Sequence, residues 1–255
     1  MPSWDPTQYL RFADHRTRPV RDLLAAVVYD HPAGVVDVGC GPGNSTALLA
    51  ERWPGAGLIG IDSSAEMIER ARASLPGVRF VVADLRRWQP PSPVDVVFSN
   101  ATLHWVEDHR GVFERLVSWL APGGVLAVQM PANFDRPSHV LMRELAASRR
   151  WSGRLGDVLR STPVRTPSDY YRVLARAGRT VDIWTTEYLH ALTGEDPVVQ
   201  WVAGSALRPL LDLLEGADAA DFLSEYTDAV REAYPPETDG TTLFPFRRMF
   251  IVCRV

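Results

Sequence analysis

The sequence predicts an α/β fold built on a doubly wound, mostly parallel sheet. Apolar runs of strand length alternate with segments of helical spacing through the first half of the chain, a pattern typical of strand–helix–strand units. A glycine-rich turn at residues 39–43 joins the first strand to the first of these helices, and the next three strands each end in a polar residue. In such sheets ligands bind at the carboxyl ends of the strands, so we expect a binding site there.

Each element follows from its local pattern. Strands are expected where four to eight residues are mostly β-branched or aromatic, and helices where apolar residues recur every three or four positions. The expected strands cover residues 35–39, 58–62, 78–83, 94–99, 125–131, 181–188 and 246–253, and the expected helices cover 44–52, 64–74, 108–120 and 168–178, with further helical segments in 132–165 and two helices in 197–234.

Composition excludes several classes of protein. The 255 residues are 46% hydrophobic, enough for one large core, and the net charge is −4 with no basic run longer than a pair. Clustered cations are needed to neutralise phosphates, so we expect no nucleic-acid partner. No apolar run approaches the roughly 20 residues that span a bilayer, and the start lacks the pattern of a secretory signal. We therefore expect a cytoplasmic protein without a membrane partner.

The two cysteines predict neither a disulfide framework nor a metal site. Cys40 lies in the glycine-rich turn and Cys253 near the chain end, a spacing that fits no metal-ligand motif. We expect no bound metal.

The chain contains no lysine, so all 27 of its basic residues are arginine. A GC-rich genome that encodes arginine in place of lysine is one explanation. The other is that some arginines bind carboxylates, because the planar guanidinium pairs with a carboxylate through two hydrogen bonds. The composition leaves both open.

The glycine-rich turn indicates that the backbone approaches a ligand closely. Gly39, Gly41 and Gly43 alternate after the first strand, and such glycines admit a close ligand and expose N–H groups to it. A turn that binds a nicotinamide dinucleotide more often has the form Gly-x-Gly-x-x-Gly, and Asn44 stands where its last glycine would be. A glycine turn without a ligand is a weaker alternative, given the polar residues at the other strand ends.

The first strand and its turn read Asp37-Val38-Gly39-Cys40-Gly41-Pro42-Gly43-Asn44. This Asp-x-Gly-x-Gly-x-Gly form resembles the class I S-adenosylmethionine (SAM) methyltransferases. The resemblance implies a Rossmann-like, mostly parallel seven-stranded sheet whose last strand is antiparallel, with an inserted helical cap. It also implies that the turn surrounds the methionine end of SAM, with Asp37, Gly39, Cys40, Gly41 and Asn44 as binding residues.

Further SAM-binding residues follow the second strand. Asp62 lies at the distance along the chain that places a carboxylate on a ribose, and an ionised carboxylate accepts hydrogen bonds from both hydroxyls. Alternatively Asp62 caps the next helix, a role that Ser63 or Ser64 could fill equally well. Met67 lies either on the adenine face or in the core.

The third and fourth strands supply the remaining SAM candidates. Asp84 could accept a hydrogen bond from the adenine amino group, with Leu85 donating its backbone N–H, although a surface turn is an alternative. Asn100 is expected beside the methionine moiety and the transferring methyl, where Ala101 leaves room.

The fourth strand is followed by His104 and Trp105, which we expect to contact substrate at the ligand-binding edge, although a structural role for His104 is equally open. No motif supplies a dedicated catalytic base. A carboxylate acceptor needs none, because its pKa of about 4 leaves it ionised at neutral pH.

Beyond the SAM-binding half, the chain is similar to the trans-aconitate 2-methyltransferases along nearly its whole length. The segments that carry this resemblance include Trp4-Asp5-Pro6, Arg16-Thr17-Arg18-Pro19, Leu103-His104-Trp105-Val106, Gln129-Met130-Pro131, Tyr170-Tyr171, Leu207-Arg208-Pro209 and Leu243-Phe244-Pro245-Phe246-Arg247-Arg248.

The resemblance implies methyl transfer from SAM to a carboxylate of trans-aconitate, which gives a monomethyl ester and S-adenosylhomocysteine. The small acid would be the substrate, and the oligomeric state is left open. A tricarboxylate needs cations, so we expect Arg16, Arg208 and Arg248 to hold the carboxylates that do not react. A tight arginine pair on the attacking carboxylate would reduce its nucleophilicity, so we expect neutral donors to orient it. The candidates for that role are His104, Gln129 and Tyr171.

Three alternatives remain. The chain could methylate another small carboxylic acid or a malonyl thioester, it could bind SAM as a regulator without turnover, or it could be a nicotinamide dehydrogenase.

One methyltransferase domain is expected over residues 1–255. Its core would comprise residues 30–131, 168–190 and 241–255, and its helical cap residues 1–29, 132–167 and 195–238.

Overall fold

A computed structural model describes residues 13–156, 158, 164–177 and 180–255, with side chains from residue 17 onward. The chain forms two compact units. The sheet unit comprises Arg16–Pro131, Val164–Thr186 and Arg248–Val255; the helical unit comprises the described residues of 132–158 and Glu187–Arg247. Each unit has its own core.

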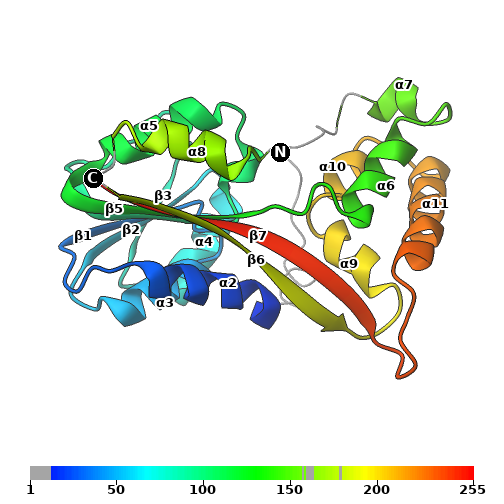
Figure 1. The fold of residues 1–255 in the computed structure, drawn as a ribbon, viewed down its shortest axis with the longest axis horizontal. Coiled ribbons are helices and arrows are strands. Elements are labelled where there is room, and N and C mark those ends of the chain that lie inside the picture. Colours follow the sequence, from blue (N-terminus) through cyan, green and yellow to red (C-terminus); the bar gives the residue numbers. More distant parts are fainter. Residues whose placement is uncertain (1–12, 157, 159–163, 178–179) are drawn as a thin grey trace. The chain divides into compact units, whose positions relative to one another are not determined.

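The sheet has seven strands in the order β3-β2-β1-β4-β5-β7-β6 (Figure 1). The first five strands run parallel, and β7 runs antiparallel to β5. This confirms the predicted fold class. The strands are β1 (Gly34–Val38), β2 (Gly57–Asp62), β3 (Arg79–Val82), β4 (Val94–Asn100), β5 (Leu120–Pro131), β6 (Thr180–Leu192) and β7 (Thr242–Arg254).

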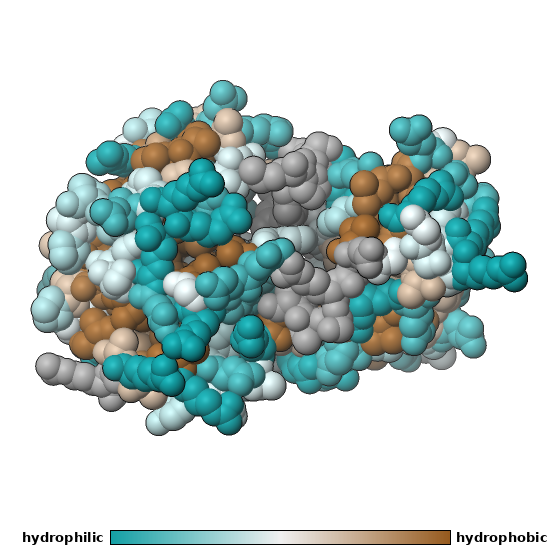
Figure 2. Space-filling model, turned by 90° about the horizontal axis from the view of Figure 1, so that it is seen from above, coloured by the Kyte–Doolittle hydropathy of each residue, from teal (hydrophilic) through white to brown (hydrophobic). Residues whose placement is uncertain are grey.

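Helices cover both faces of the sheet. In Figure 1, α5 (His109–Ser118) and α8 (Pro167–Leu174) lie on one face, and α2 (Ala13–Ala26) and α3 (Asn44–Arg52) lie on the other. Because both faces are covered, β1 and β4 are almost entirely buried, which explains why most of their residues are apolar. Figure 2 views the side of α5 and α8, where hydrophilic side chains of the sheet unit surround smaller hydrophobic areas.

Local chemistry fixes where these helices begin. The Ser64 side chain accepts a hydrogen bond from Met67 N at the start of α4 (Ala65–Ser74). Asp108 caps α5 in the same way, and Thr166 and Asp169 form a reciprocal capping box at α8. Such caps satisfy backbone donors that have no partner within the helix.

The fifth strand is longer than predicted. The sequence predicts a helix up to residue 120 and a strand at 125–131, but β5 already begins at Leu120. Its pairing with β4 shifts between Val94 and Val96, and Gly123 adopts φ 84°. The glycines therefore form an irregularity within the strand.

The sequence assigns residues 1–29 to the cap, whereas the chain from Arg16 onward belongs to the sheet unit. The segment after α2 is tied to that unit by hydrogen bonds. Arg52 Nη2 donates to Val27 O at 3.0 Å, and Tyr29 Oη donates to Asp95 Oδ1 at 2.8 Å. Residues 1–12 lie outside the described residues.

The helical unit is built from α6 (Pro137–Ala146), α7 (Ser152–Leu155), α9 (Pro197–Ala203), α10 (Arg208–Leu211) and α11 (Ala217–Ala233). Where the sequence predicts two helices over residues 197–234, the structure has three, because Gly204 ends α9 and Gly216, at φ 55°, precedes α11.

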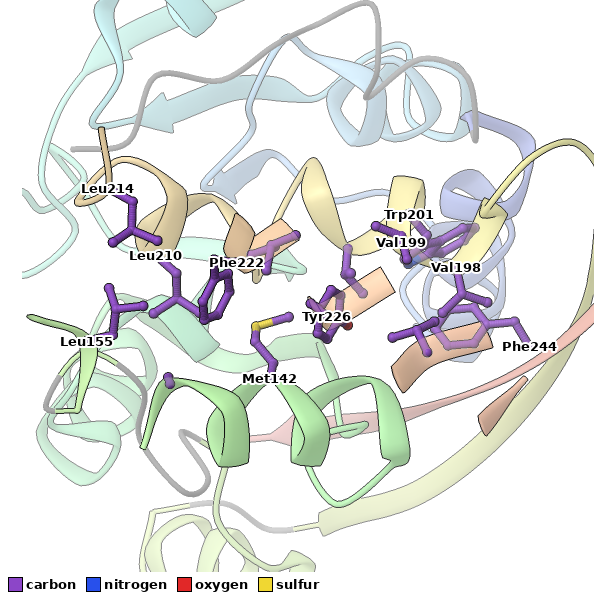
Figure 3. Close-up of a cluster of buried hydrophobic side chains, with 14 of the residues drawn as sticks. Met142, Leu155, Val198, Val199, Trp201, Leu210, Leu214, Phe222, Tyr226 and Phe244 are labelled. Atoms are coloured by element: carbon purple, nitrogen blue, oxygen red, sulfur yellow. The ribbon is translucent and has the colours of Figure 1, made fainter. Parts of the chain in front are cut away.

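Large apolar side chains fill the core of the helical unit. In Figure 3, Met142 of α6 points toward Phe222 and Tyr226 of α11, and Trp201 of α9 lies near Phe244 of β7. The rings of Trp201 and Phe244 are 5.8 Å apart. None of the helices among the described residues is long and apolar enough to span a membrane.

Candidate functional site

The glycine-rich turn after β1 adopts backbone conformations that favour glycine. Gly39, Gly41 and Gly43 have φ angles of 69°, 53° and 96°. A Cβ at Gly39 would lie 2.2 Å from the side chain of Thr102, which follows β4 and whose Oγ1 donates to Gly39 O at 3.1 Å. Gly39 is therefore required by the neighbouring loop as well as by its own conformation.

The N–H groups of this turn donate hydrogen bonds to acceptors within the protein. Gly39 N and Cys40 N donate to Ile61 O at 2.8 and 3.0 Å, Gly43 N donates to Cys40 O, and Gly41 N donates to Asp62 Oδ2. The expectation that the turn offers free N–H groups is wrong for these four. Its part in binding is to bring backbone close to a ligand.

The Cys40 side chain points into the core. It is 3% exposed and lies in a cluster with Ile68, Ala71 and Phe80. Burial and the nearby carboxylates of Asp37 and Asp62 raise the pKa of its thiol far above the usual value. Cys40 can therefore contribute to the site only through its backbone.

Asp37 of β1 lies beneath the start of α3. Its carboxylate is fully buried, and Oδ2 accepts hydrogen bonds from the hydroxyls of Ser45 and Thr46, each at 2.7 Å. Burial raises the pKa of Asp37 to about 6, and the two hydroxyls oppose that rise. A carboxylate is favourable beside a helix N-terminus, where a dinucleotide phosphate would otherwise bind. This arrangement disfavours the dehydrogenase alternative.

One oxygen of Asp37 is left over. Oδ1 is buried and has no hydrogen-bond partner within the described part of the chain. A buried acceptor without a donor is costly, so this atom fits an N–H group of a ligand.

Of the two roles that the sequence leaves open for Asp62, the helix cap is filled by Ser64, and ribose binding stays a prediction. Asp62 Oδ1 accepts from Ser64 N at 2.9 Å and its Oδ2 from Gly41 N at 3.0 Å, while the Ser64 hydroxyl caps α4. A carboxylate has about four acceptor positions, so each oxygen can accept one more donor. Asp62 is half-buried and thus accessible to ribose hydroxyls, with Ser63 exposed and Met67 half-buried beside it.

Asp84 is engaged by a neighbouring arginine. Its two oxygens accept hydrogen bonds from Arg86 N, Nε and Nη2, and these contacts hold the pKa of Asp84 at about 2. The arginine is exposed, so this pair is readily exchanged for another partner. Leu85 is buried, and its carbonyl accepts from Arg115 Nε at 3.1 Å.

The end of β4 is held in an uncommon conformation. Ala101 has φ 52°, and its N–H donates to Gln129 O of β5 at 2.9 Å. Positive φ is rare outside glycine, and such residues often mark functional sites. The preceding residue, Asn100, has a buried Oδ1 with no partner among the described residues.

A short 3₁₀-helix, η1 (Leu103–Trp105), follows. Its His104 and Trp105 rings contact each other at 4.8 Å between centroids. Trp105 is 46% exposed, and His104 is half-buried. An exposed tryptophan beside a histidine suits contact with a ligand.

Gln129 and Arg248 form a buried polar pair next to Asn100. Gln129 is in register with Asn100 of β4, and Arg248 of β7 is opposite Pro131 of β5. Because side chains alternate between faces along a strand, the three side chains lie on the same face of the sheet. Arg248 is 4% exposed and donates through Nη1 to Gln129 Oε1 at 3.4 Å.

The other substrate candidates belong to other elements. Tyr171 of α8 is 54% exposed, whereas its neighbour Tyr170 is buried and hydrogen-bonded to His109 Nδ1. Arg208 belongs to the helical unit and donates to Asp212 Oδ1 at 2.9 Å. The side chain of Arg16 lies outside the described residues.

Sequence inspection misses several residues that shape the site: Ser45 and Thr46, which bind Asp37, Thr102, which packs on Gly39, and Arg86, which binds Asp84. A signal for the first two is present, since polar residues open a helix directly after the glycine turn. Arg86 binds Asp84 two residues before it, a local contact, whereas Thr102 is identifiable only from its tertiary contact with Gly39.

Comparison with known proteins gives consistent results. Residues 35–124 match a family described as a methyltransferase domain. A trans-aconitate 2-methyltransferase of Streptomyces avermitilis is 53% identical over 264 residues, covering 99% of this chain and 97% of that protein. One from Azoarcus is 49% identical, covering 99% of each chain.

Solved structures share the fold at low sequence identity. The YcgJ protein of Bacillus subtilis superposes with a TM-score of 0.61 at 15% identity, covering 94% of this chain and 98% of its own. Phosphoethanolamine N-methyltransferase 2 of Haemonchus contortus, solved with S-adenosyl-L-methionine, gives a TM-score of 0.54 at 15% identity, covering 92% of this chain and 52% of its own. These likenesses show the fold alone.

Proposed function

Since the chain belongs to the trans-aconitate 2-methyltransferase family, we propose that it transfers a methyl group from SAM to a carboxylate of trans-aconitate. The products would be the monomethyl ester and S-adenosylhomocysteine. The observation that carries this proposal is the identity of about half of all residues over nearly the whole chain. That match extends through the helical unit as well as the sheet unit, so it covers more than the part common to many methyltransferases.

The residues at the strand ends fit SAM. Asp62 has acceptor positions left for the ribose hydroxyls, and the buried Oδ1 atoms of Asp37 and Asn100 suit the N–H groups of the methionine end. Gly39 and Gly41 bring the backbone close, together with Cys40 and Asn44.

The adenine end would be bound by the next two strand ends. Asp84 and the N–H of Leu85 would face the adenine, with Met67 and Ser63 beside it and Ala101 near the methionine moiety. When bound, SAM supplies a methyl group on a positively charged sulfur.

In this reaction the main task of the protein side chains is to orient the acid. A substrate carboxylate has a pKa of about 4 and is ionised at neutral pH, so no protein group has to remove a proton. His109 is unsuited to that task, since burial lowers its pKa and its Nδ1 is hydrogen-bonded to Tyr170. Correct placement of reactants alone can supply much of the barrier reduction.

Cations and neutral donors would hold the acid. Arg248, Arg208 and Arg16 are the cationic candidates, and His104, Trp105, Gln129 and Tyr171 are candidates to line the acid site. The cytoplasm is the compartment in which we expect the reaction to occur.

The decisive experiment incubates the protein with methyl-labelled SAM and a panel of small acids. Label should enter trans-aconitate with the highest kcat/KM and appear as a methyl ester. If another acid or a malonyl thioester is preferred, the assigned substrate is wrong, but methyl transfer from SAM is still the reaction. SAM binding without transfer to any member would indicate a regulator, and bound nicotinamide absorbance a dehydrogenase.

A further inference from the structure

The sheet unit contains a buried polar pair, Arg248 and Gln129, whose division of roles follows from its geometry. Arg248 is 4% exposed and Gln129 is 0% exposed. Both are held by a paired backbone, since Gln129 pairs with Asn100 on one side and with Phe250 on the other. Polar side chains buried in this way, near the end of β5 and in the middle of β7, are energetically expensive and are commonly functional.

Arg248 determines which way the Gln129 amide points. A guanidinium only donates hydrogen bonds, so the carbonyl Oε1 of Gln129 must face Arg248 Nη1, at 3.4 Å. The amide nitrogen is then directed elsewhere. Gln129 Nε2 is buried and has no acceptor among the residues that the structure describes. A ligand oxygen would satisfy it.

The neighbouring strand adds an acceptor. Asn100, aligned with Gln129, has its Oδ1 buried and without a partner in the described chain. The two unpartnered atoms thus differ in kind, a donor on β5 and an acceptor on β4. An anionic oxygen of the acid can bind only to the donor, Gln129 Nε2. The acceptor, Asn100 Oδ1, is left for an N–H group of the cofactor.

We propose that Gln129 and Arg248 form the subsite for the reacting carboxylate of the acid, in which Gln129 Nε2 donates to the substrate and Arg248 holds the Gln129 amide in the donating orientation. This inference rests on the proposed function. A neutral amide orients the carboxylate while leaving its electron density available for attack, whereas a direct bidentate arginine would withdraw it. Arg248 is therefore a positioning residue, and its positive charge also attracts the anion.

The main test is Gln129→Glu, which nearly preserves the size of the side chain. The new carboxylate can pair with Arg248, so the fold should be kept, but the amide donors are lost and a negative charge meets the anionic substrate. We expect kcat/KM for trans-aconitate to fall at least about 100-fold, as when a site that binds a polar group loses its partner. The dissociation constant of SAM should change less than about twofold.

The matched control is Gln89→Glu, which makes the same change of charge at an exposed position of the sheet unit. It should retain wild-type kinetics.

Arg248→Lys, which keeps the charge and one donor to Oε1, should lose less activity than Arg248→Met. Both variants should affect kcat/KM for the acid more than they affect SAM affinity. A purely structural role would instead lower stability and SAM binding together.

Binding of trans-aconitate, measured by calorimetry in the presence of S-adenosylhomocysteine, separates this inference from the proposed function. If wild type methylates the acid and Gln129→Glu does so equally well, the subsite is overturned and the function stands. If wild type binds but does not methylate the acid, and Gln129→Glu no longer binds it, the subsite stands and the function fails. If wild type neither binds nor methylates any small acid, both are overturned.

Discussion

Asp37 Oδ2 lies 2.7 Å from the Thr46 hydroxyl, so a carboxylate with no solvent exposure is held at the N-terminal turn of α3. The strand and the helix on either side of the glycine turn are thereby joined by a hydrogen bond to a charged group. Such bonds contribute about 1.5–3 kcal/mol. This bond between β1 and α3 holds the two ends of the turn together, independently of a ligand.

The buried carboxylate should make stability depend on pH. Burial raises the pKa of Asp37 from 3.8 to about 6. The folded protein therefore binds this proton more tightly than the unfolded chain, and the resulting stability is present below the unfolded pKa and lost as the pH rises through 6. At about 1.4 kcal/mol per pKa unit, the loss is roughly 3 kcal/mol.

Asp37→Asn removes this titration. The free energy of unfolding of the variant, minus that of wild type, should increase by roughly 3 kcal/mol from acid to neutral pH, measured by urea unfolding at several pH values. A difference independent of pH would show that Asp37 does not titrate in this range.

Gly39→Ala should destabilise the protein by about 2–4 kcal/mol, because it combines a positive φ with overpacking. The new Cβ would lie 2.2 Å from Thr102. Gly41→Ala is the control, since it has φ 53° and no atom within 4 Å of its Cβ, and it should cost only about 1–2 kcal/mol. Thr102→Gly added to Gly39→Ala should recover part of the loss, and equal effects of the two single variants would contradict the packing explanation.

Asp62→Ala should weaken SAM binding at least about tenfold, given the 1.5–3 kcal/mol of a hydrogen bond to a charged group. Asp84→Ala should have a smaller effect, because Arg86 already occupies much of the acceptor capacity of Asp84. Calorimetry gives both affinities, with Asp169→Ala, an exposed capping residue of α8, as the control. Wild-type affinity in folded Asp62→Ala would refute the placement of the ribose.

The acceptor carboxylate is already ionised, so kcat should show no essential base in the neutral range. The expected pH profile is flat from roughly 6.5 to 8.5. Substrate carboxylates protonate near pH 4, and Asp37, whose pKa is raised to about 6, protonates below this range as well. Stopped assays with labelled SAM measure this profile. A steep ascending limb centred above pH 7 would require a catalytic base and would exclude a carboxylate acceptor.

Periodicity and turn chemistry in the sequence predict the sheet well. The strands β1, β2 and β4 are mostly apolar, and their ends fall within about one residue of the expected positions. The start of β5 is not predictable in this way, because Gly123 and Gly124 indicate a stop locally while pairing with β4 extends the strand across them. Tertiary hydrogen bonds decide that boundary.

The site is predictable in outline but not in its hydrogen bonds. The polar strand ends indicate where ligands bind, yet the sequence does not show that Ile61 O accepts two N–H groups of the turn or that Arg86 binds Asp84. Of the arginines expected to hold the acid, Arg208 lies in the helical unit and Arg248 in the sheet unit. Arg248, near the chain end, contacts Gln129 because β7 is inserted next to β5.

The contact between Gly39 and Thr102 bears on how glycine signatures are used to assign function. The side chain of Thr102 occupies the space that a Cβ at position 39 would need. Selection for a well-packed loop would therefore preserve this glycine even in a descendant that had lost its cofactor. Asn100, whose Oδ1 lacks a donor within the described chain, would be free to change once binding was no longer under selection, whereas the hydrogen bonds of Asp37 to Ser45 and Thr46 would still preserve that residue.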